Sequence, residues 1–104
     1  MRITKWNERE HGALTEAAAR GRYHPALYEV LVRRVDEAVR LTGEAPRRML
    51  IGLEGFWFLE AEGRRAVIQP GDVVEIASGE FVFEAAGPVL YLAVYPLPPD
   101  KVVN

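Results

Sequence analysis

The chain has no cysteine, only two histidines and no long apolar run, and each scarcity removes a class of function. Without cysteine there is no disulfide framework, no thiol nucleophile and no cysteine metal site. The formal charge of −2 is too close to neutral to indicate a nucleic acid partner. No apolar run reaches transmembrane length, and the opening MRITKWNERE lacks the apolar stretch of a signal peptide. We therefore expect a cytoplasmic protein that binds neither nucleic acid nor membranes.

At 104 residues the chain is predicted to form a single domain. We divide it into an N-terminal strand and helix over residues 1–22, a core over residues 27–97 and a C-terminal tail over residues 98–104. Arginine outnumbers lysine 11 to 2. This bias is typical of a heat-adapted, thermophilic source, although a GC-rich genome produces it too.

The helix signals lie in the first 42 residues. Arg2–Trp6 is predicted as an opening strand, and the alanine-rich run Gly12–Arg20 as a short helix that Gly21 ends as a C-terminal cap. The segment Pro25–Thr42 fits two interpretations. As a helix, it has Pro25 at the first helical position and an apolar face. As two strands with a turn near Asp36, it alternates, with Tyr28, Val30 and Val32 on one side and Glu29, Leu31 and Arg33 on the other.

From residue 48 onward, short apolar runs alternate with glycine turns. After a turn predicted at Thr42–Pro46 come six predicted strands: Arg48–Leu53, Phe56–Ala61, Arg65–Ile68, Val73–Ala77, Glu80–Glu84 and Val89–Tyr95. Short strands at this spacing are typical of a sandwich or a barrel. The prolines Pro96, Pro98 and Pro99 are expected to end the sheet, because proline cannot donate to a ladder.

An ordered set of turns and strands runs through the centre of the chain: Leu53-Glu54-Gly55, Pro70-Gly71-Asp72, the strand Val73–Ile76, Gly79 and Phe83. Pro70 fixes its own φ and Gly71 permits a positive φ, so the pair forms a tight turn before a buried strand. The set resembles the cupin superfamily. The resemblance implies an all-β fold, a single cupin-type barrel (double-stranded β-helix or jelly roll) with a short N-terminal helix. It also favours strands for Pro25–Thr42.

Most cupins bind a divalent metal through three histidines and a glutamate, and this chain has other residues at those positions. Counted back from the Leu-Glu-Gly turn, the two first histidine positions fall on Thr42 and Glu44, and the glutamate position falls on Arg48. The third histidine position falls on Phe81 or, without a one-residue gap, on Val82. A lone carboxylate does not hold a transition ion, and Arg48 adds positive charge. We therefore expect no metal and no cofactor.

Aromatic side chains and one arginine dominate the predicted interior. Trp57 faces away from its two phenylalanine neighbours because side chains alternate along a strand, and the later strands add Phe81, Phe83, Tyr91 and Tyr95. In one interpretation these rings fill the barrel, as side chains do in small barrels. In the other they line a small apolar pocket whose polar groups are tyrosine hydroxyls and an arginine. For the pocket we predict the ligand-binding residues Glu44, Arg48, Trp57, Phe81 and Tyr91.

Acid–base candidates are few. His11 and His24 lie outside both motifs, and an exposed position near a helix end or turn explains either of them. His24, with Tyr28 close by in the sequence, is the candidate catalytic pair because histidine titrates near neutral pH.

The resulting hypothesis is a metal-free cupin-like domain that binds or senses a small organic ligand. One alternative is a metal-independent isomerase or epimerase acting on a small sugar or organic acid. Another is a filled structural barrel with no ligand. We also expect a homodimer, because cupins often pair through edge strands and exposed edges need a cover.

Overall fold

The computed structural model describes residues 1–98, which form nine strands and two short helices. The strands are β1 (Arg2–Lys5), β2 (Tyr28–Val35), β3 (Val39–Ala45), β4 (Arg48–Glu54), β5 (Trp57–Ala61), β6 (Arg64–Ile68), β7 (Asp72–Ile76), β8 (Gly79–Ala85) and β9 (Val89–Pro96). The helices α1 (Glu8–His11) and α2 (Glu16–Arg22) lie between β1 and β2, and neither could cross a membrane, being too short and too polar. From residue 99 on, the predicted C-terminal tail, with Pro99, lies outside the described residues.

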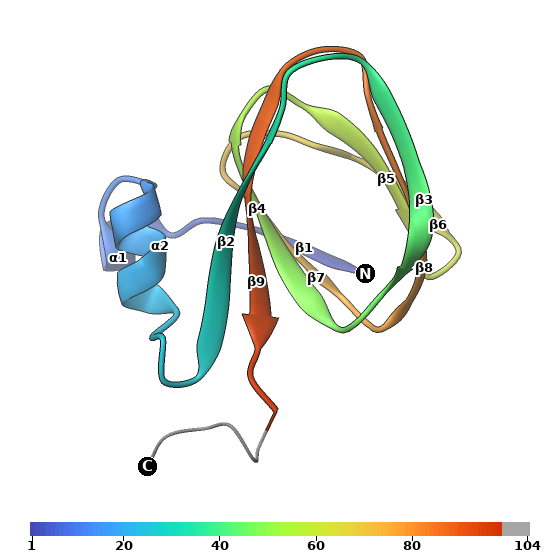
Figure 1. Ribbon diagram of the computed structural model, residues 1–104. Helices are drawn as coiled ribbons and strands as arrows, with labels where there is room; N and C mark the ends of the chain where they lie inside the picture. The colour runs from blue at the N-terminus through green and yellow to red at the C-terminus, as the bar shows by residue number, and fades with distance from the viewer. Residues whose placement is uncertain (99–104) are drawn as a thin grey trace.

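The strands form two antiparallel sheets that face each other (Figure 1). The five-stranded sheet has the order β1-β7-β4-β9-β2, and the four-stranded sheet has the order β3-β8-β5-β6. From β2 onward the chain crosses from one sheet to the other at every turn except the β5–β6 hairpin, as a jelly roll does. Within residues 1–98 no strand pairing joins the two sheets, so the predicted barrel consists of two facing sheets rather than one closed ladder.

The six strands predicted after residue 48 are confirmed, and the strand interpretation of Pro25–Thr42 is correct. β2 pairs with β9 along its whole length, from Tyr28 opposite Pro96 to Val35 opposite Val89. The turn predicted at Thr42–Pro46 is wrong, because β3 continues to Ala45. Pairing with β8, which places Gly43 opposite Phe81, overrides the local turn signal of the glycine.

The predicted helix exists, but its limits differ. It starts at Glu16, because the side chain of Thr15 accepts a hydrogen bond from the backbone N–H of Ala18 at 3.0 Å. The assignment of Gly21 as its cap is wrong, since α2 continues to Arg22 and Tyr23 is the C-cap. The sequence analysis missed α1, whose N-cap Asn7 accepts from the backbone of Glu10 at 3.2 Å.

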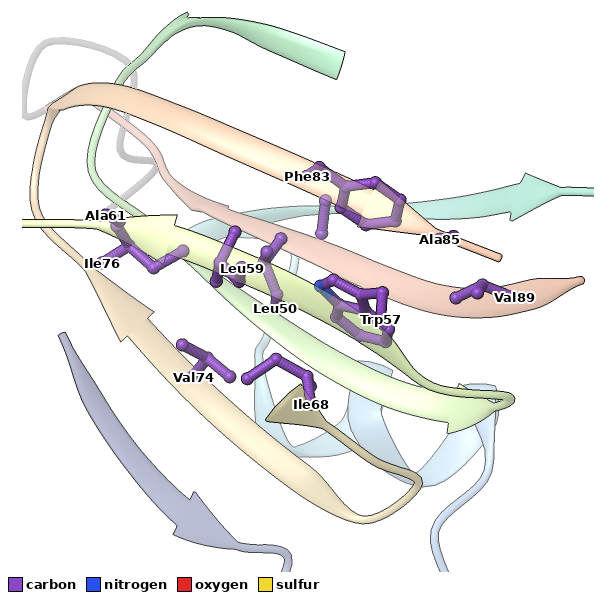
Figure 2. Packing of buried hydrophobic residues seen from close by; sticks show 11 residues of the cluster. Leu50, Trp57, Leu59, Ala61, Ile68, Val74, Ile76, Phe83, Ala85 and Val89 are labelled. Carbon is purple, nitrogen blue, oxygen red and sulfur yellow. The ribbon is translucent and has the colours of Figure 1, made fainter. Parts of the chain in front are cut away.

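Two apolar layers hold the domain together. The first lies between the sheets and contains Leu50, Trp57, Leu59, Ala61, Ile68, Val74, Ile76, Phe83, Ala85, Val89 and Ala93 (Figure 2). The second lies on the outer side of the five-stranded sheet, where α2 packs, and contains Trp6, Ala19, Tyr23, Val30, Ile51, Val73, Leu92 and Val94. Because alternate residues of β4, β7 and β9 point to opposite layers, these strands are apolar on both faces.

The two turns that carry the family resemblance are held by specific contacts. Gly55 has φ +73°, and a Cβ there would lie 2.2 Å from the carbonyl oxygen of Pro88, so no other residue fits. In the Pro70-Gly71-Asp72 turn, the buried carboxylate of Asp72 accepts a hydrogen bond from the backbone N–H of Gln69 at 2.8 Å. The same carboxylate forms an ion pair with Lys5, which ties β1 to β7.

Candidate functional site

Arg48 is the most unusual side chain between the two sheets. It begins β4 on the same face as Leu50, opposite Ile76, and only 5% of it is exposed. Its Nη1 donates a hydrogen bond to the carbonyl oxygen of Pro46 at 3.1 Å. Its guanidinium carbon lies 5.0 Å from the ring centre of Phe81, which is a cation–π contact. Burial lowers the pKa of Arg48, because a buried charge loses its hydration.

Tyr91 and Tyr95 of β9 lie near this guanidinium, and a second arginine, Arg33, lies opposite Tyr91. Burial raises the pKa of Tyr91, and the positive charges of Arg33 and Arg48 partly offset that effect, so both arginines lie near its hydroxyl. Tyr95 is close enough to act on both Tyr91 and Arg48. We call these five residues the arginine–tyrosine cluster: Arg33, Arg48, Phe81, Tyr91 and Tyr95.

The cluster is rich in hydrogen-bond donors. The carbonyl oxygen of Pro46 is the acceptor that Arg48 uses, and the carboxylate of Glu29 lies opposite Tyr95 on the same inner face. Among residues 1–98, neither Arg33 nor Arg48 forms an ion pair with a carboxylate. No hydrogen bond of the described part of the chain uses the hydroxyl of Tyr91 or Tyr95. Of the buried side-chain nitrogen and oxygen atoms in residues 1–98, only Trp57 Nε1 lacks a hydrogen-bond partner, so the free donors of the cluster reach solvent and are open to an acceptor from outside.

Two edge strands of different sheets, β2 and β3, border the interior beside the cluster, as β1 and β6 do on the opposite side. Leu41 of β3 lies opposite the buried Phe83, yet 45% of it is exposed. Arg33 of β2 is also exposed, although it lies opposite Tyr91. Inner-face side chains of both β2 and β3 therefore reach solvent on this side.

Trp57, which we predicted as a ligand-binding residue, lies deeper in the interior than the cluster. It is fully buried and its ring centre is 5.5 Å from that of Phe83 and 5.1 Å from that of Tyr91. Its Nε1–H is buried and has no hydrogen-bond partner. The tryptophan therefore forms the packed floor beneath the cluster, and side chains fill the space between the sheets at this level (Figure 2).

Comparison with solved structures identifies the fold. A cupin-2 domain protein from Shewanella frigidimarina has a TM-score of 0.57 at 18% identity, over 67% of this chain and 71% of that one. A cupin protein from Bacteroides fragilis has a TM-score of 0.57 at 20% identity, over 75% and 71%. The chain has a cupin fold. The putative ethanolamine utilization protein Q of Salmonella typhimurium has a TM-score of 0.59 at 18% identity, over 92% of this cupin-fold chain and 68% of its own. No family model and no curated protein matches the sequence.

The residues at the metal positions of cupins do not fit a metal centre in this chain. Thr42 and Glu44 lie opposite Val82 and Glu80, on the outer face of the four-stranded sheet, whereas Arg48 lies between the sheets. Within the part of the chain that the structure describes, no three His, Cys, Asp or Glu side chains come together as metal ligands. The metal position itself therefore offers a guanidinium where a cation would need carboxylate or imidazole ligands.

Glu44 is separated from the other predicted ligand-binding residues. It lines an open depression of about 950 Å³ on the outer face of the four-stranded sheet, together with Glu60 and Arg65. There Arg65 already donates to Glu60 at 2.7 Å and to Glu84 at 3.0 Å, so its charge is satisfied. Glu44 is not part of the arginine–tyrosine cluster.

The candidate catalytic residues also lie outside the cluster. His24 is exposed, and its Nδ1 accepts a hydrogen bond from the backbone N–H of Ala26 at 3.0 Å, so it shapes the turn before β2. Tyr28 packs edge-on against Tyr23, with ring centres 5.3 Å apart, on the outer side of the five-stranded sheet.

Three members of the cluster belong to the predicted ligand-binding residues, and two do not. Arg48, Phe81 and Tyr91 were predicted, and the structure brings them together. Tyr95 was named only as one more aromatic ring, and Arg33 only as part of an alternating strand. The alternation of side chains along β2 and β9 could have indicated both residues. Once the two strands are paired, it places Arg33 and Tyr91 on the same inner face.

Proposed function

We propose that this cupin-fold domain binds a small organic carboxylate at the arginine–tyrosine cluster and serves as a binding or sensing module. The observation that supports the proposal is Arg48, a residue that is 5% exposed and whose guanidinium has no carboxylate partner in residues 1–98. A carboxylate offers two oxygens in the plane and spacing that a guanidinium prefers. Binding would pair a charge that the fold has already removed from water.

The surroundings of Arg48 favour a small ligand with an apolar part. The hydroxyls of Tyr91 and Tyr95 add donors for the carboxylate oxygens, and the ring of Phe81 offers an apolar face. The floor formed by Trp57 is packed, which limits how deep a ligand reaches. An isomerase-like activity has less support, because His24, its candidate base, is exposed and engaged in a turn.

Thermal unfolding in the presence of carboxylates tests this function. The panel is acetate, malonate and benzoate, with acetamide and benzamide as uncharged matches of similar shape. A carboxylate at a hundred times its dissociation constant stabilises the folded state by about 2.7 kcal/mol. For a domain of this size that corresponds to a rise in melting temperature of roughly 10 °C. The amides should have no effect, because they lack the charge.

Two variants locate the binding. Arg48→Met removes the guanidinium and should abolish the stabilisation by carboxylates. Arg47→Met removes the charge of the neighbouring, exposed residue and should leave it intact. The proposal fails if no carboxylate stabilises the natural chain, or if Arg48→Met responds to them as the natural chain does.

A further inference from the structure

A second concave surface lies on the other face of the five-stranded sheet, beside α2. Its volume is about 420 Å³, within the range of sites for small molecules. The end of α2, β1, the start of β2 and the β4 and β7 strands contribute to it, so we call it the helix–sheet groove. Its lining includes Arg2, Thr4, Arg22, Tyr23, Arg47 and Glu75.

Positive charge is concentrated in this groove although the whole chain is slightly acidic. Four arginines line it, Arg2, Arg22, Arg47 and Arg48, and one carboxylate, Glu75. Glu75 is engaged by Arg2 at 3.5 Å. Among residues 1–98, Arg22 and Arg47 form no ion pair, and the guanidinium of Arg22 lies 5.0 Å from the ring centre of Tyr23. A concave surface with one sign of charge raises the local concentration of the opposite ion.

Tyr23 provides a second, independent observation. Only 6% of its surface is exposed, and it belongs to the apolar layer under α2. It nevertheless lines the groove, and no hydrogen bond in the described part of the chain uses its hydroxyl. The ring of Tyr23 is buried, but its hydroxyl is not among the buried atoms that lack a hydrogen-bond partner in residues 1–98, so the oxygen reaches the solvent that fills the groove. Here the free hydroxyl group belongs to the same surface as two unpaired guanidinium groups.

The remaining walls are apolar. Tyr28 packs edge-on against Tyr23, and Leu27, Met49 and Val73 also line the groove. A ligand that matches this surface has an anionic group with several acceptor oxygens and a compact apolar body. Phosphate fits better than carboxylate here, because it has three oxygens and up to two charges for donors on several elements.

We propose that the helix–sheet groove binds the phosphate group of a small organic phosphate, with Arg22 and Arg47 pairing with the phosphate and the Tyr23 hydroxyl donating to it. This site shares Arg48 with the arginine–tyrosine cluster and no other residue, and the proposal stands whether or not the cluster binds carboxylates. Arg22, Arg47 and Tyr23 belong to the groove alone, so substitutions there test this site.

Calorimetric titration with phenyl phosphate tests the proposal, with inorganic phosphate and benzoate as comparison ligands. Phenyl phosphate should bind, and the Arg22→Gln/Arg47→Gln variant should lose binding at least a hundredfold. The Arg9→Gln/Arg34→Gln variant has the same net charge but an unchanged groove lining, and should bind within about threefold of the natural chain. Tyr23→Phe keeps the ring and its packing, and should weaken binding about tenfold, the effect of one hydrogen bond to a charged group.

The three ligands separate the parts of the site. If inorganic phosphate binds as tightly as phenyl phosphate, the apolar walls of the groove contribute no affinity. The groove would then bind free phosphate, and the proposal that its ligand is an organic phosphate would be wrong. The site itself is refuted if phenyl phosphate does not bind the natural chain, if Tyr23→Phe binds it unchanged, or if both double variants lose binding equally. None of these outcomes bears on carboxylate binding at Arg48, which is tested by the response of Arg48→Met to carboxylates. Benzoate is common to both experiments and should bind the Arg22→Gln/Arg47→Gln variant as it binds the natural chain.

Discussion

Replacing Arg48 with methionine should leave the fold as stable as before or make it more stable, which is unusual for so buried a residue. The methionine keeps an unbranched apolar side chain in the interior beside Phe81. It removes one charged hydrogen bond to Pro46 and one cation–π contact, which together stabilise the fold by about 3 kcal/mol. It also removes the cost of holding a guanidinium away from water, which is several kcal/mol for a buried ion.

These two effects nearly cancel, and their balance sets the expected result. We expect the free energy of unfolding of Arg48→Met to lie between that of the natural chain and a value about 2 kcal/mol higher. The melting temperature would then rise by up to about 8 °C for a domain of this size. Urea denaturation followed by tryptophan fluorescence measures the change directly, since Trp57 is buried beneath the cluster.

A matched control separates the buried charge from charge in general. Arg47 is the preceding residue, is exposed and carries the same charge, so Arg47→Met should change stability by less than about 0.5 kcal/mol. The reasoning is refuted if Arg48→Met lowers the free energy of unfolding by about 3 kcal/mol or more. A loss of that size is typical of breaking a satisfied buried ion pair, and would mean that Arg48 already has the partner it needs.

Two further predictions concern the turns and the buried hydroxyls. Gly55→Ala should lower the free energy of unfolding by about 2–4 kcal/mol, because a Cβ would meet the carbonyl oxygen of Pro88. Gly63 has a similar φ but open space around it, so Gly63→Ala should lower it by about 1 kcal/mol. Equal losses for the two variants in urea denaturation would contradict the clash at Gly55. Burial raises the pKa of Tyr23 and Tyr91 above the usual 10.0, so the unfolded chain loses these protons first and the melting temperature should fall as pH rises above 10.0. In a melting series from about pH 8 to 11, the Tyr23→Phe/Tyr91→Phe variant should fall less than the natural chain, and an equal fall would show that neither hydroxyl is responsible.

The sequence was informative where a local signal and the tertiary structure agree. The six later strands follow from glycine turns and apolar runs, and at Gly55, Gly63, Gly71 and Gly79 the backbone has the positive φ that favours glycine. Gly55 illustrates this, since its positive φ and its contact with Pro88 both exclude a side chain. The central strands were equally clear, because Val73 and Val74 are buried on opposite faces of one sheet and give a continuous apolar run.

Prediction failed where a long-range partner decides the structure. Gly43 has the local signature of a turn, but pairing with Phe81 keeps it in β3. The end of α2 was misplaced for a similar reason, since Tyr23 packs into the layer under the helix and fixes where the helix stops. The homodimer stays a prediction. β1, β2, β3 and β6 are edge strands within residues 1–98, but nothing in a single chain shows which edge another copy would cover.

The position of Arg48 is the basis of the proposed anion binding. The sequence resemblance to cupins assigns a metal-ligating glutamate to this position, in an interior that holds a cation. Here a fixed positive charge occupies that position, while Trp57 and Phe83 fill the interior below it. The charge that we propose the interior attracts is therefore negative. The ligand proposed to pair with Arg48 is an anion, and we expect it to approach from the side between β2 and β3, where Arg33 is exposed. A structure with benzoate tests this proposal. A carboxylate beside Arg48 would support it, and a carboxylate bound elsewhere would leave the buried charge unexplained.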